Sequence, residues 1–529
     1  MIYFIPAWYS KNDWKENEQI WYTRRMHTEV DDTVKQLQLF DRKSSFDSQT
    51  ILLQYSPNYR HFLHRQGLLH SEYWSVFDVI QGVQLKSSAV FSFHDLAWPE
   101  NIEFQYTSFD IVALKDNEKY ATIEFGEDGN MIQVDLYENN ELRRKNIYDD
   151  RGFLSSTMVY RNQTWSYIQY LDESGKWRIC QYEDGHVDVN PSSSSYLIQF
   201  NQKEFCFSFQ KQRYEDISGI IEEVMMNYIQ LHETDSIYCI AMHDLHSHVL
   251  TNVLNEKKKI LSFYNTRCIP NKKESSLQLV KESECVVVNS KNVFEKIGLN
   301  QIQTKAKWTD ITPFDSRVDF GHSLQLKYQN ILIPVDELEY EVFEKLIVIF
   351  MKYMQTNMNA RINLFTRKSD WNKETLLLEK TQQILRKYKF DTNYARKQTN
   401  QRMENAFEEE VPILFSVSQC VDELSVSKCL KEQRLIVDLE SNLDLFLQIS
   451  AISMGIPQIV MHETDYVIDE KNGRVLNDIS ELDEVLHYYL DTLQHWNSAM
   501  IESYEIGKKF SSDNLLNQWE GVIGYVQKC

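Results

Sequence analysis

Residues 243–248, His-Asp-Leu-His-Ser-His, bring three histidines and one aspartate together within a short stretch of the chain. Imidazole nitrogens and carboxylate oxygens are groups that bind transition metals. The stretch follows the apolar segment 236–241, which is typical of a strand, and open α/β sheets bind ligands beyond the carboxyl ends of their strands. His246 and His248 share one face only in an extended segment, whereas this one more readily opens a helix. We therefore expect a hydrogen-bonding or helix-capping role and predict no metal site.

Two other short patterns carry a weaker signal. Ser425 to Lys428 matches the SxxK pattern of acyl-serine enzymes, but no KTG follows and the serine lies among helical residues. His94 and Asp95 lie near Trp98 in the sequence, without further residues that would complete a site. We predict no catalytic role for either pattern.

Residues 439–457, LESNLDLFLQISAISMGIP, are the most informative stretch. They resemble the donor-sugar segment of retaining GT-B glycosyltransferases. In that segment one Glu opens a glycine-rich turn, and a second Glu eight residues later lies on a helix that ends in a small-x-Gly-x-Pro turn. The first carboxylate contacts the sugar, and the second accepts hydrogen bonds from the ribose hydroxyls. The helix end is retained here as Met454-Gly455-Ile456-Pro457.

The two acidic positions of that segment are occupied by Asn442 and Ser450, and leucines 443 and 445 replace the glycines. Bulky leucines would fill the space that a sugar phosphate requires. The structural part of the motif is thus kept and its chemical part is missing. We predict a degenerate donor site, and the alternative is a different alignment or a different chemistry.

Three further observations point the same way. The first strand runs into Pro6-Ala7-Trp8-Tyr9 instead of a glycine-rich loop. After the strand 330–334, where the resemblance predicts a phosphate-binding Arg, the chain has Val335, Asp336 and Glu337, and carboxylates would repel a diphosphate. Glycine contributes 15 of 529 residues, about 3% against an average near 7%. Enzymes that cradle phosphates on backbone amides need glycines at such turns.

Between residues 101 and 214 the sequence pattern changes. Aromatic and β-branched runs are separated there by turn signals, most of them every ten to twelve residues. This spacing predicts an antiparallel meander of hairpins. Its tyrosines and tryptophans suit the face of an extended, exposed sheet. The turn signals lie at 128–129, 139–140, 150–152, 162–163, 173–175, 184–185 and 201–202.

Strands alternate with helical patterns on both sides of the meander, which predicts βαβ units and parallel sheets. Strands are expected at 2–5, 236–241, 260–263, 285–288, 330–334, 361–365, 412–416, 435–438 and 458–460. The expected fold class is α/β, GT-B-like, with two Rossmann-like domains facing a cleft and the β-meander inserted in the first. The N-terminal domain would span 1–100 and 215–324, the insertion 101–214 and the C-terminal domain 325–510. A final helix at 511–529 would cross back to the first domain.

Composition excludes several classes of protein. A net charge of −21 argues against nucleic acid as a partner, since phosphate binding needs a basic face. No apolar stretch approaches the ~18 residues of a membrane span, and the N-terminal residues lack the features of a signal peptide. Eight scattered cysteines without a CxxC pair predict reduced thiols in the cytoplasm.

Over essentially its whole length the chain resembles the first protein of the accessory Sec secretory (Asp) set. The resemblance is carried by the interrupted α/β domain and by residues 242–246 (MHDLH), 311–317 (ITPFDSR) and 330–336 (NILIPVD). It implies a catalytically degenerate GT-B glycosyltransferase relative that acts in export of serine-rich repeat adhesins. It also implies a complex with the second and third Asp-set proteins, which helps deliver the glycosylated adhesin preprotein to the accessory Sec ATPase and channel.

Two hypotheses follow from these observations. The first is a non-catalytic export subunit without cofactor or metal, and the second is an active GT-B glycosyltransferase that modifies the adhesin from a sugar-nucleotide donor. Asn442 and Ser450 favour the first. The long meander edge is a reason to expect partners, because a monomer would have to protect it. The basic pairs 24–25, 143–144 and 386–387 are candidates for contact with anionic lipids at the cytoplasmic membrane face.

Overall fold

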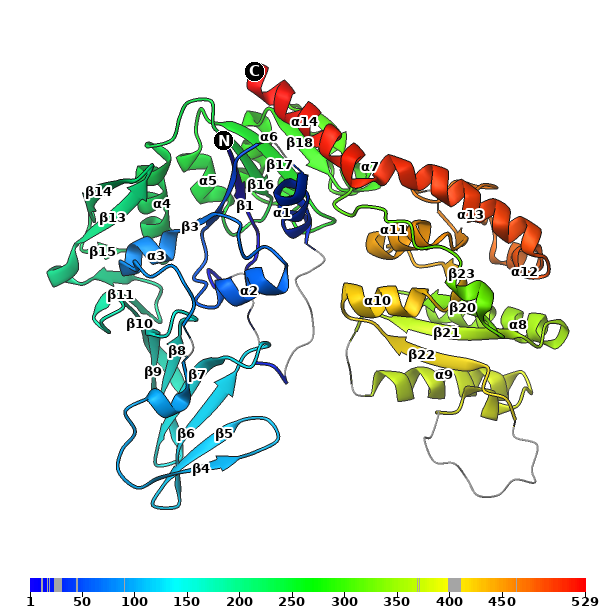
Figure 1. Cartoon of the computed structure of the whole chain (residues 1–529), viewed down its shortest axis with the longest axis horizontal. Helices are drawn as coiled ribbons and strands as arrows, with labels where there is room; N and C mark the ends of the chain where they lie inside the picture. Colours follow the sequence, from blue (N-terminus) through cyan, green and yellow to red (C-terminus); the bar gives the residue numbers. More distant parts are fainter. Residues whose placement is uncertain are drawn as a thin grey trace. The chain divides into compact units, whose positions relative to one another are not determined.

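The computed structural model describes the chain except residues 11, 12, 17, 19, 23–30, 44, 45, 90, 369, 371, 398–410 and 463. Contacts between residues divide the chain into two compact units (Figure 1). Unit 1 contains Asp31–Ile311 with the N-terminal segment and Trp519–Cys529, and unit 2 consists chiefly of Thr312–Gln518. No helix of the described part is long and apolar enough to cross a membrane.

A parallel sheet of seven strands forms the centre of unit 1, in the order β19-β18-β17-β16-β1-β2-β3. Its central strands are continuous apolar runs buried on both faces, as parallel sheets require. The strands are β1 (Ile2–Ile5), β2 (Ser48–Leu52), β3 (Tyr73–Ser75), β16 (Ile237–Ala241), β17 (Lys258–Phe263), β18 (Cys285–Val288) and β19 (Lys307–Asp310). Because the strand order reverses between β1 and β16, the chain ends that leave these two strands lie side by side.

The helices of unit 1 bury an apolar stripe against this sheet, as α4 does with Ile217, Ile220, Ile221, Val224 and Tyr228. They are α1 (Asp32–Lys43), α2 (Tyr59–Arg65), α3 (Val76–Gln81), α4 (Ile217–Ile229), α5 (Ser247–Val253), α6 (Glu274–Glu282) and α7 (Lys291–Lys296).

The meander forms an antiparallel sheet of ten strands, in the order β15-β12-β11-β10-β9-β8-β7-β6-β5-β4. The strands are β4 (Ile102–Tyr106), β5 (Ile111–Lys115), β6 (Glu118–Phe125), β7 (Met131–Glu138), β8 (Glu141–Tyr148), β9 (Leu154–Arg161), β10 (Thr164–Leu171), β11 (Trp177–Tyr182), β12 (Val187–Val189) and β15 (Arg213–Tyr214). The expectation of one sheet is wrong for residues 195–208. There β13 (Ser195–Phe200) and β14 (Lys203–Ser208) form a separate hairpin, since Tyr196 and Ile198 are buried in the unit 1 core.

The tight turns of the sheet follow the chemistry of their residues. Asn139 and Asn140 have φ angles of 51° and 61°, and Asn162 and Gln163 have 51° and 65°. Two consecutive left-handed residues match the right-handed twist of the flanking strands, and asparagine tolerates this conformation. The predicted hairpin turns at these positions are confirmed.

The aromatic side chains of the sheet are less exposed than expected. Tyr148 and Tyr170 are buried, and Tyr170 keeps only 1% of its surface exposed because it packs against Tyr55 and Phe77 of the unit 1 core. The strongly exposed aromatics are Tyr106 and Phe109, at the β4–β5 turn. The prediction of an exposed aromatic face is therefore wrong for the strands that pack on the parallel sheet.

Unit 2 is a second parallel α/β unit, with strand order β22-β21-β20-β23-β24-β25. The strands are β20 (Gln329–Pro334), β21 (Ala360–Thr366), β22 (Phe415–Gln419), β23 (Gln433–Asp438), β24 (Gln458–Val460) and β25 (Gly473–Val475). The helices are α8 (Tyr340–Thr356), α9 (Lys373–Lys387), α10 (Glu423–Leu430), α11 (Leu445–Met454), α12 (Leu482–Leu490) and α13 (Leu493–Gly507). The strand expected at 412–416 begins three residues later.

The last helix, α14 (Ser512–Lys528), ends against unit 1. The ring of Trp519 lies 6.1 Å from that of Phe40, and Lys258 Nζ donates to the Gln527 carbonyl at 2.7 Å. Lys307 Nζ lies over the Tyr525 ring at 5.1 Å. The C-terminal residues are therefore part of the unit that begins the chain.

Candidate functional site

The stretch that resembles a sugar-donor segment forms the carboxyl end of β23 and the helix α11. Asp444 caps the helix by accepting a hydrogen bond from the Leu447 amide at 3.2 Å. At the other end Gly455 has a φ of 68°, a left-handed conformation that glycine adopts without strain. A Cβ added at this position would lie 2.6 Å from Met500 Cγ. The glycine is thus required both for the turn that ends α11 and for the close packing against Met500.

Neither position that would carry a donor-binding acid offers a carboxylate. Asn442 lies exposed in the loop before α11 and donates from Nδ2 to Glu337 Oε2 at 2.6 Å. Ser450 is 8% exposed within α11. Leu445 is buried and Leu443 half-buried. Position 442 thus presents an amide that is paired with a carboxylate, and position 450 presents a buried hydroxyl.

The loop after β20 holds Val335, which is buried, and Asp336. Asp336 accepts hydrogen bonds from Thr366 Oγ1 at 2.5 Å and from the Arg367 amide at 2.7 Å, and Lys373 Nζ lies 3.5 Å away. We expected Asp336 to repel a diphosphate. Lys373 offsets part of the Asp336 charge, and the repulsion of a diphosphate stays a prediction. The sequence pattern did not reveal these donors because they lie in and after β21 and on α9.

Arg367 is the cation at this edge of the sheet that the sequence reasoning missed. Its Nε lies 3.3 Å from Asp444 Oδ2, and its Nη1 donates to the Cys420 carbonyl at 3.2 Å. Its guanidinium lies 5.8 Å from the ring centre of Phe446. Its place directly after the apolar segment 361–365 was the signal that could have identified it. The side chain is held by groups of the same unit.

Two more carboxyl groups complete the edge. Glu440 Oε1 accepts a hydrogen bond from the Glu337 amide at 2.6 Å, and burial raises the pKa of Glu440. Asp438 is 2% exposed, and burial together with nearby Glu440 raises its pKa well above the ordinary value. A phosphate would require cations and free amides here. Arg367 and Lys373 at this edge are paired with Asp444 and Asp336, and the Glu337 amide is already occupied.

The histidines at 243–248 lie at the carboxyl end of β16. The Tyr9 hydroxyl is 2.8 Å from His246 Nδ1, and both side chains are buried. Burial, assisted by the neighbouring His243, lowers the pKa of His246 well below its ordinary value. His243 Nδ1 accepts from the Leu245 amide at 3.1 Å, and burial lowers the pKa of His243 to about 4. Both imidazoles are thus held neutral.

The expected hydrogen-bonding role is confirmed for His246 and His243. The capping role is wrong, because α5 begins after His246 without a side-chain cap. Asp244 accepts from Ser276 Oγ at 3.0 Å and from Cys268 Sγ at 3.3 Å, which fixes the loop. In the described part of the chain no group of three or more metal-binding side chains converges.

The basic pairs proposed for lipid contact have different surroundings. Residues 24 and 25 lie outside the described residues. Arg143 Nη2 lies 3.0 Å from Glu141 Oε2, and Lys387 Nζ lies 2.5 Å from Glu344 Oε1. Arg144 and Arg386 are exposed. Acidic neighbours thus offset one charge of each described pair.

Comparison with known families and curated proteins gives a match over the whole chain. The family model for the first Asp protein of the accessory Sec system matches residues 1–525. A curated protein of that description from Streptococcus gordonii is 32% identical over 98% of this chain and 98% of its own length. Another from Staphylococcus aureus is 30% identical over 99% of each chain.

Solved structures give a matching result for the fold. A structure of accessory secretory proteins 1, 2 and 3 from Streptococcus pneumoniae matches with a TM-score of 0.80 and 27% identity, covering 100% of each chain. The Gap123 complex of Streptococcus agalactiae matches with a TM-score of 0.78 and 27% identity, covering 98% of this chain and 99% of the other. The pneumococcal O-GlcNAc transferase GtfA, solved with UDP and GlcNAc, matches with 0.68 and 11% identity, covering 99% and 98%. The last likeness shows a GT-B-like fold.

Proposed function

The chain belongs to the family of the first Asp protein of the accessory Sec system, and from this membership we propose that it is a non-catalytic subunit of an export complex. The complex would contain the second and third proteins of the set. Its task would be to help deliver a glycosylated serine-rich repeat adhesin to the accessory Sec ATPase and channel. The protein would work in the cytoplasm and touch the cytoplasmic face of the membrane, with Arg144 and Arg386 as candidates for lipid contact.

The observation that carries the non-catalytic part is the internal pairing at the donor edge of unit 2. The amide of Asn442 contacts Glu337, the backbone amide of Glu337 is taken by Glu440, and Arg367 lies against Asp444. A sugar nucleotide would have to displace these contacts and would meet carboxyl groups. Replacing satisfied hydrogen bonds gives little net free energy.

The complex is supported by the two similar solved structures, which are assemblies of accessory secretory proteins 1, 2 and 3 and of Gap123. The ten-stranded sheet ends in β4, which among the described residues pairs with a strand on one side only, and this edge is a second reason to expect a partner.

The experiment is co-purification of this chain with the second and third proteins of the set at moderate salt. We expect the three to elute together from a sizing column. Independent elution of all three would contradict the proposal. The alternative, an active GT-B glycosyltransferase, is favoured by the fold likeness to GtfA. It would require sugar transfer to the adhesin when this chain and a sugar nucleotide are supplied.

A further inference from the structure

The ten-stranded sheet is joined to the parallel sheet of unit 1 by two different kinds of contact. Strands β10 to β12 contribute Ile168, Tyr170, Ile179, Val187 and Val189 to the apolar core of the parallel sheet. Among the described residues, 102–150, which we call the far half, contribute to that core only the partly buried Ile147. They have a separate core, which includes Ala113, Ala121, Ile123, Met131 and Val134. Apart from the pairing of β8 with β9, the orientation of the far half therefore depends mainly on polar contacts.

Helix α2 supplies several of these contacts from one short segment, and Trp21 of the N-terminal segment adds hydrogen bonds to the carbonyls of Phe125 and Phe109. Arg65 Nη1 donates to Asp128 Oδ2 at 2.8 Å, and His61 Nδ1 lies 3.3 Å from the same oxygen. Arg65 Nε also lies 3.6 Å from Glu127 Oε2. Both acids belong to the turn between β6 and β7. Just before α2, Asn58 Oδ1 accepts a hydrogen bond from Asn130 Nδ2 at 3.0 Å, so a third residue of that turn is held by the same segment.

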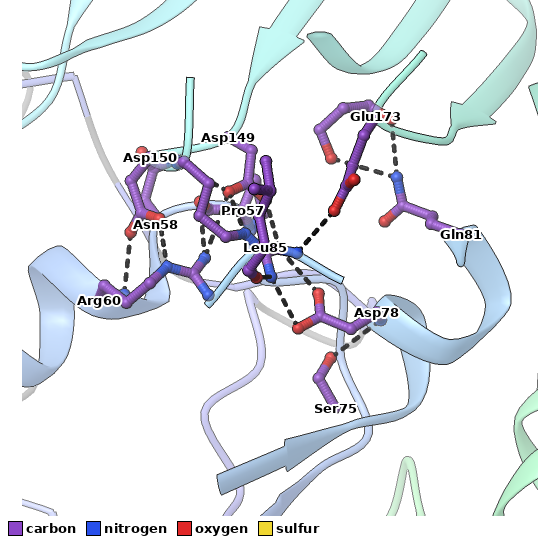
Figure 2. A network of polar contacts seen from close by, with 12 residues as sticks. Pro57, Asn58, Arg60, Ser75, Asp78, Gln81, Leu85, Asp149, Asp150 and Glu173 are labelled. Atoms are coloured by element: carbon purple, nitrogen blue, oxygen red, sulfur yellow. Dashed lines mark hydrogen bonds and ion pairs between the residues drawn. The ribbon is translucent and has the colours of Figure 1, made fainter. Parts of the chain in front are cut away.

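A second acidic turn, between β8 and β9, meets the same helix. The Arg60 amide donates to Asp150 Oδ2 at 2.9 Å and its guanidinium pairs with Asp150 Oδ1, while Nη2 lies 3.4 Å from Asp149 Oδ1 (Figure 2). From the turn itself, Arg151 donates to Asp149 at 2.7 Å and to Asp78 of α3 at 2.8 Å. The side chains of Arg60, Asp149, Asp150 and Arg151 are all 5% exposed or less.

Buried charge networks add little net stability, because desolvation of the ions offsets their attraction. Arg60 and Arg65 nevertheless each reach more than one acidic side chain at once, and the planar fork of a guanidinium can do so in only a narrow range of orientations. The basic side chains of α2 face acidic side chains on two hairpin turns. These pairs therefore specify an orientation more than they stabilise the fold.

We propose that α2 is a charged clamp that fixes the far half of the ten-stranded sheet in one orientation relative to the parallel sheet of unit 1. Arg60, His61 and Arg65 are then positioning residues for the surface that the sheet offers to a partner protein. This last part rests on the proposed function as a complex subunit, with the second and third Asp-set proteins as the partners.

Arg65 Nη2 also lies 2.7 Å from Glu18 Oε2 of the N-terminal segment. The test uses the full chain with Arg65→Gln, which leaves Glu18, Glu127 and Asp128 together without their shared cation. Arg143→Gln is the matched control, since Arg143 lies in the same sheet and pairs with Glu138 and Glu141 of its own hairpin. We expect amide exchange in the β6–β7 turn and in β4–β5 to rise about tenfold or more in Arg65→Gln and to stay unchanged in the control. Unchanged exchange in Arg65→Gln would overturn the clamp.

Partner binding is then measured on the same proteins with the second and third Asp-set proteins. We expect about tenfold weaker binding for Arg65→Gln and wild-type binding for Arg143→Gln. Faster exchange with undiminished binding would overturn the link between clamp and partner. A wild-type chain that binds neither protein would instead refute the proposed function, while the exchange data would still decide on the clamp. Should Arg65→Gln fail to fold, Asp128→Asn removes the same contact from the other side.

Discussion

Replacing Arg151 by Met tests whether the buried network beneath the ten-stranded sheet is as interdependent as its geometry indicates. The side chains of Arg151 and Asp149 are each 2% exposed, and methionine keeps much of the volume while removing the charge. Asp149 would keep Arg60 at 3.4 Å as its nearest cation. Removing one partner of a buried ion pair costs about 3–5 kcal/mol, because the other charge stays buried.

The loss in free energy of unfolding is measured by urea denaturation of the purified chain, with the unfolding transition of unit 1 as the signal. Arg213→Met is the matched control, since Arg213 pairs with Asp188 at 2.6 Å but its side chain is 66% exposed. Exposed pairs contribute about 1 kcal/mol or less. The double variant Arg151→Met with Asp149→Asn should recover part of the loss. A loss below about 1 kcal/mol for Arg151→Met, or a double variant as unstable as the sum of both changes, would refute the reasoning.

Three further outcomes are expected. Because burial keeps the pKa of His246 well below 6.5 in the folded chain, unfolded chains bind a proton that folded ones do not, so stability falls as pH drops below 6.5. His246→Gln should remove about 1.4 kcal/mol per pH unit from that slope between pH 6 and 5, measured by denaturation. Gly455→Ala should lower stability by about 1–3 kcal/mol in the same assay, because its Cβ would meet Met500 at 2.6 Å in a left-handed conformation. Ser450→Ala should leave adhesin export unchanged in a secretion assay, whereas loss of export in a folded variant would indicate a role for the donor edge of unit 2.

Long buried strands and tight turns could be predicted from the sequence because their signals are local. Apolar runs such as 285–288 and 458–460 became strands with the expected bounds. Strands β2, β3 and β19 were missed because the segments SQTIL, YWS and KWTD are short and half polar, so only their pairing with neighbours makes them strands.

The polar contacts between distant residues could not be predicted from local sequence patterns. Lys259 illustrates this, because it sits in a run of three lysines yet is 2% exposed, with Nζ donating to the Leu254 carbonyl at 2.9 Å. The contact between Glu337 and Asn442 joins residues 105 positions apart. That Asn442 and Ser450 carry no carboxylate could be read from the sequence. The groups that lie around Asn442 could not, because they depend on which loops the parallel sheet brings together.

The central claim is that the donor edge of unit 2 binds no sugar nucleotide. We predict that the absence of a ribose-binding carboxylate and the pairing of Arg367 with Asp444 each deprive a donor of charge-assisted hydrogen bonds worth roughly 1.5–3 kcal/mol. Two such losses amount to roughly 3–6 kcal/mol, or about a hundredfold or more in affinity. Isothermal titration calorimetry of the full chain with UDP-GlcNAc and with UDP-glucose is the most direct test. The account predicts no saturable binding of either compound, and saturable binding in the micromolar range would contradict it.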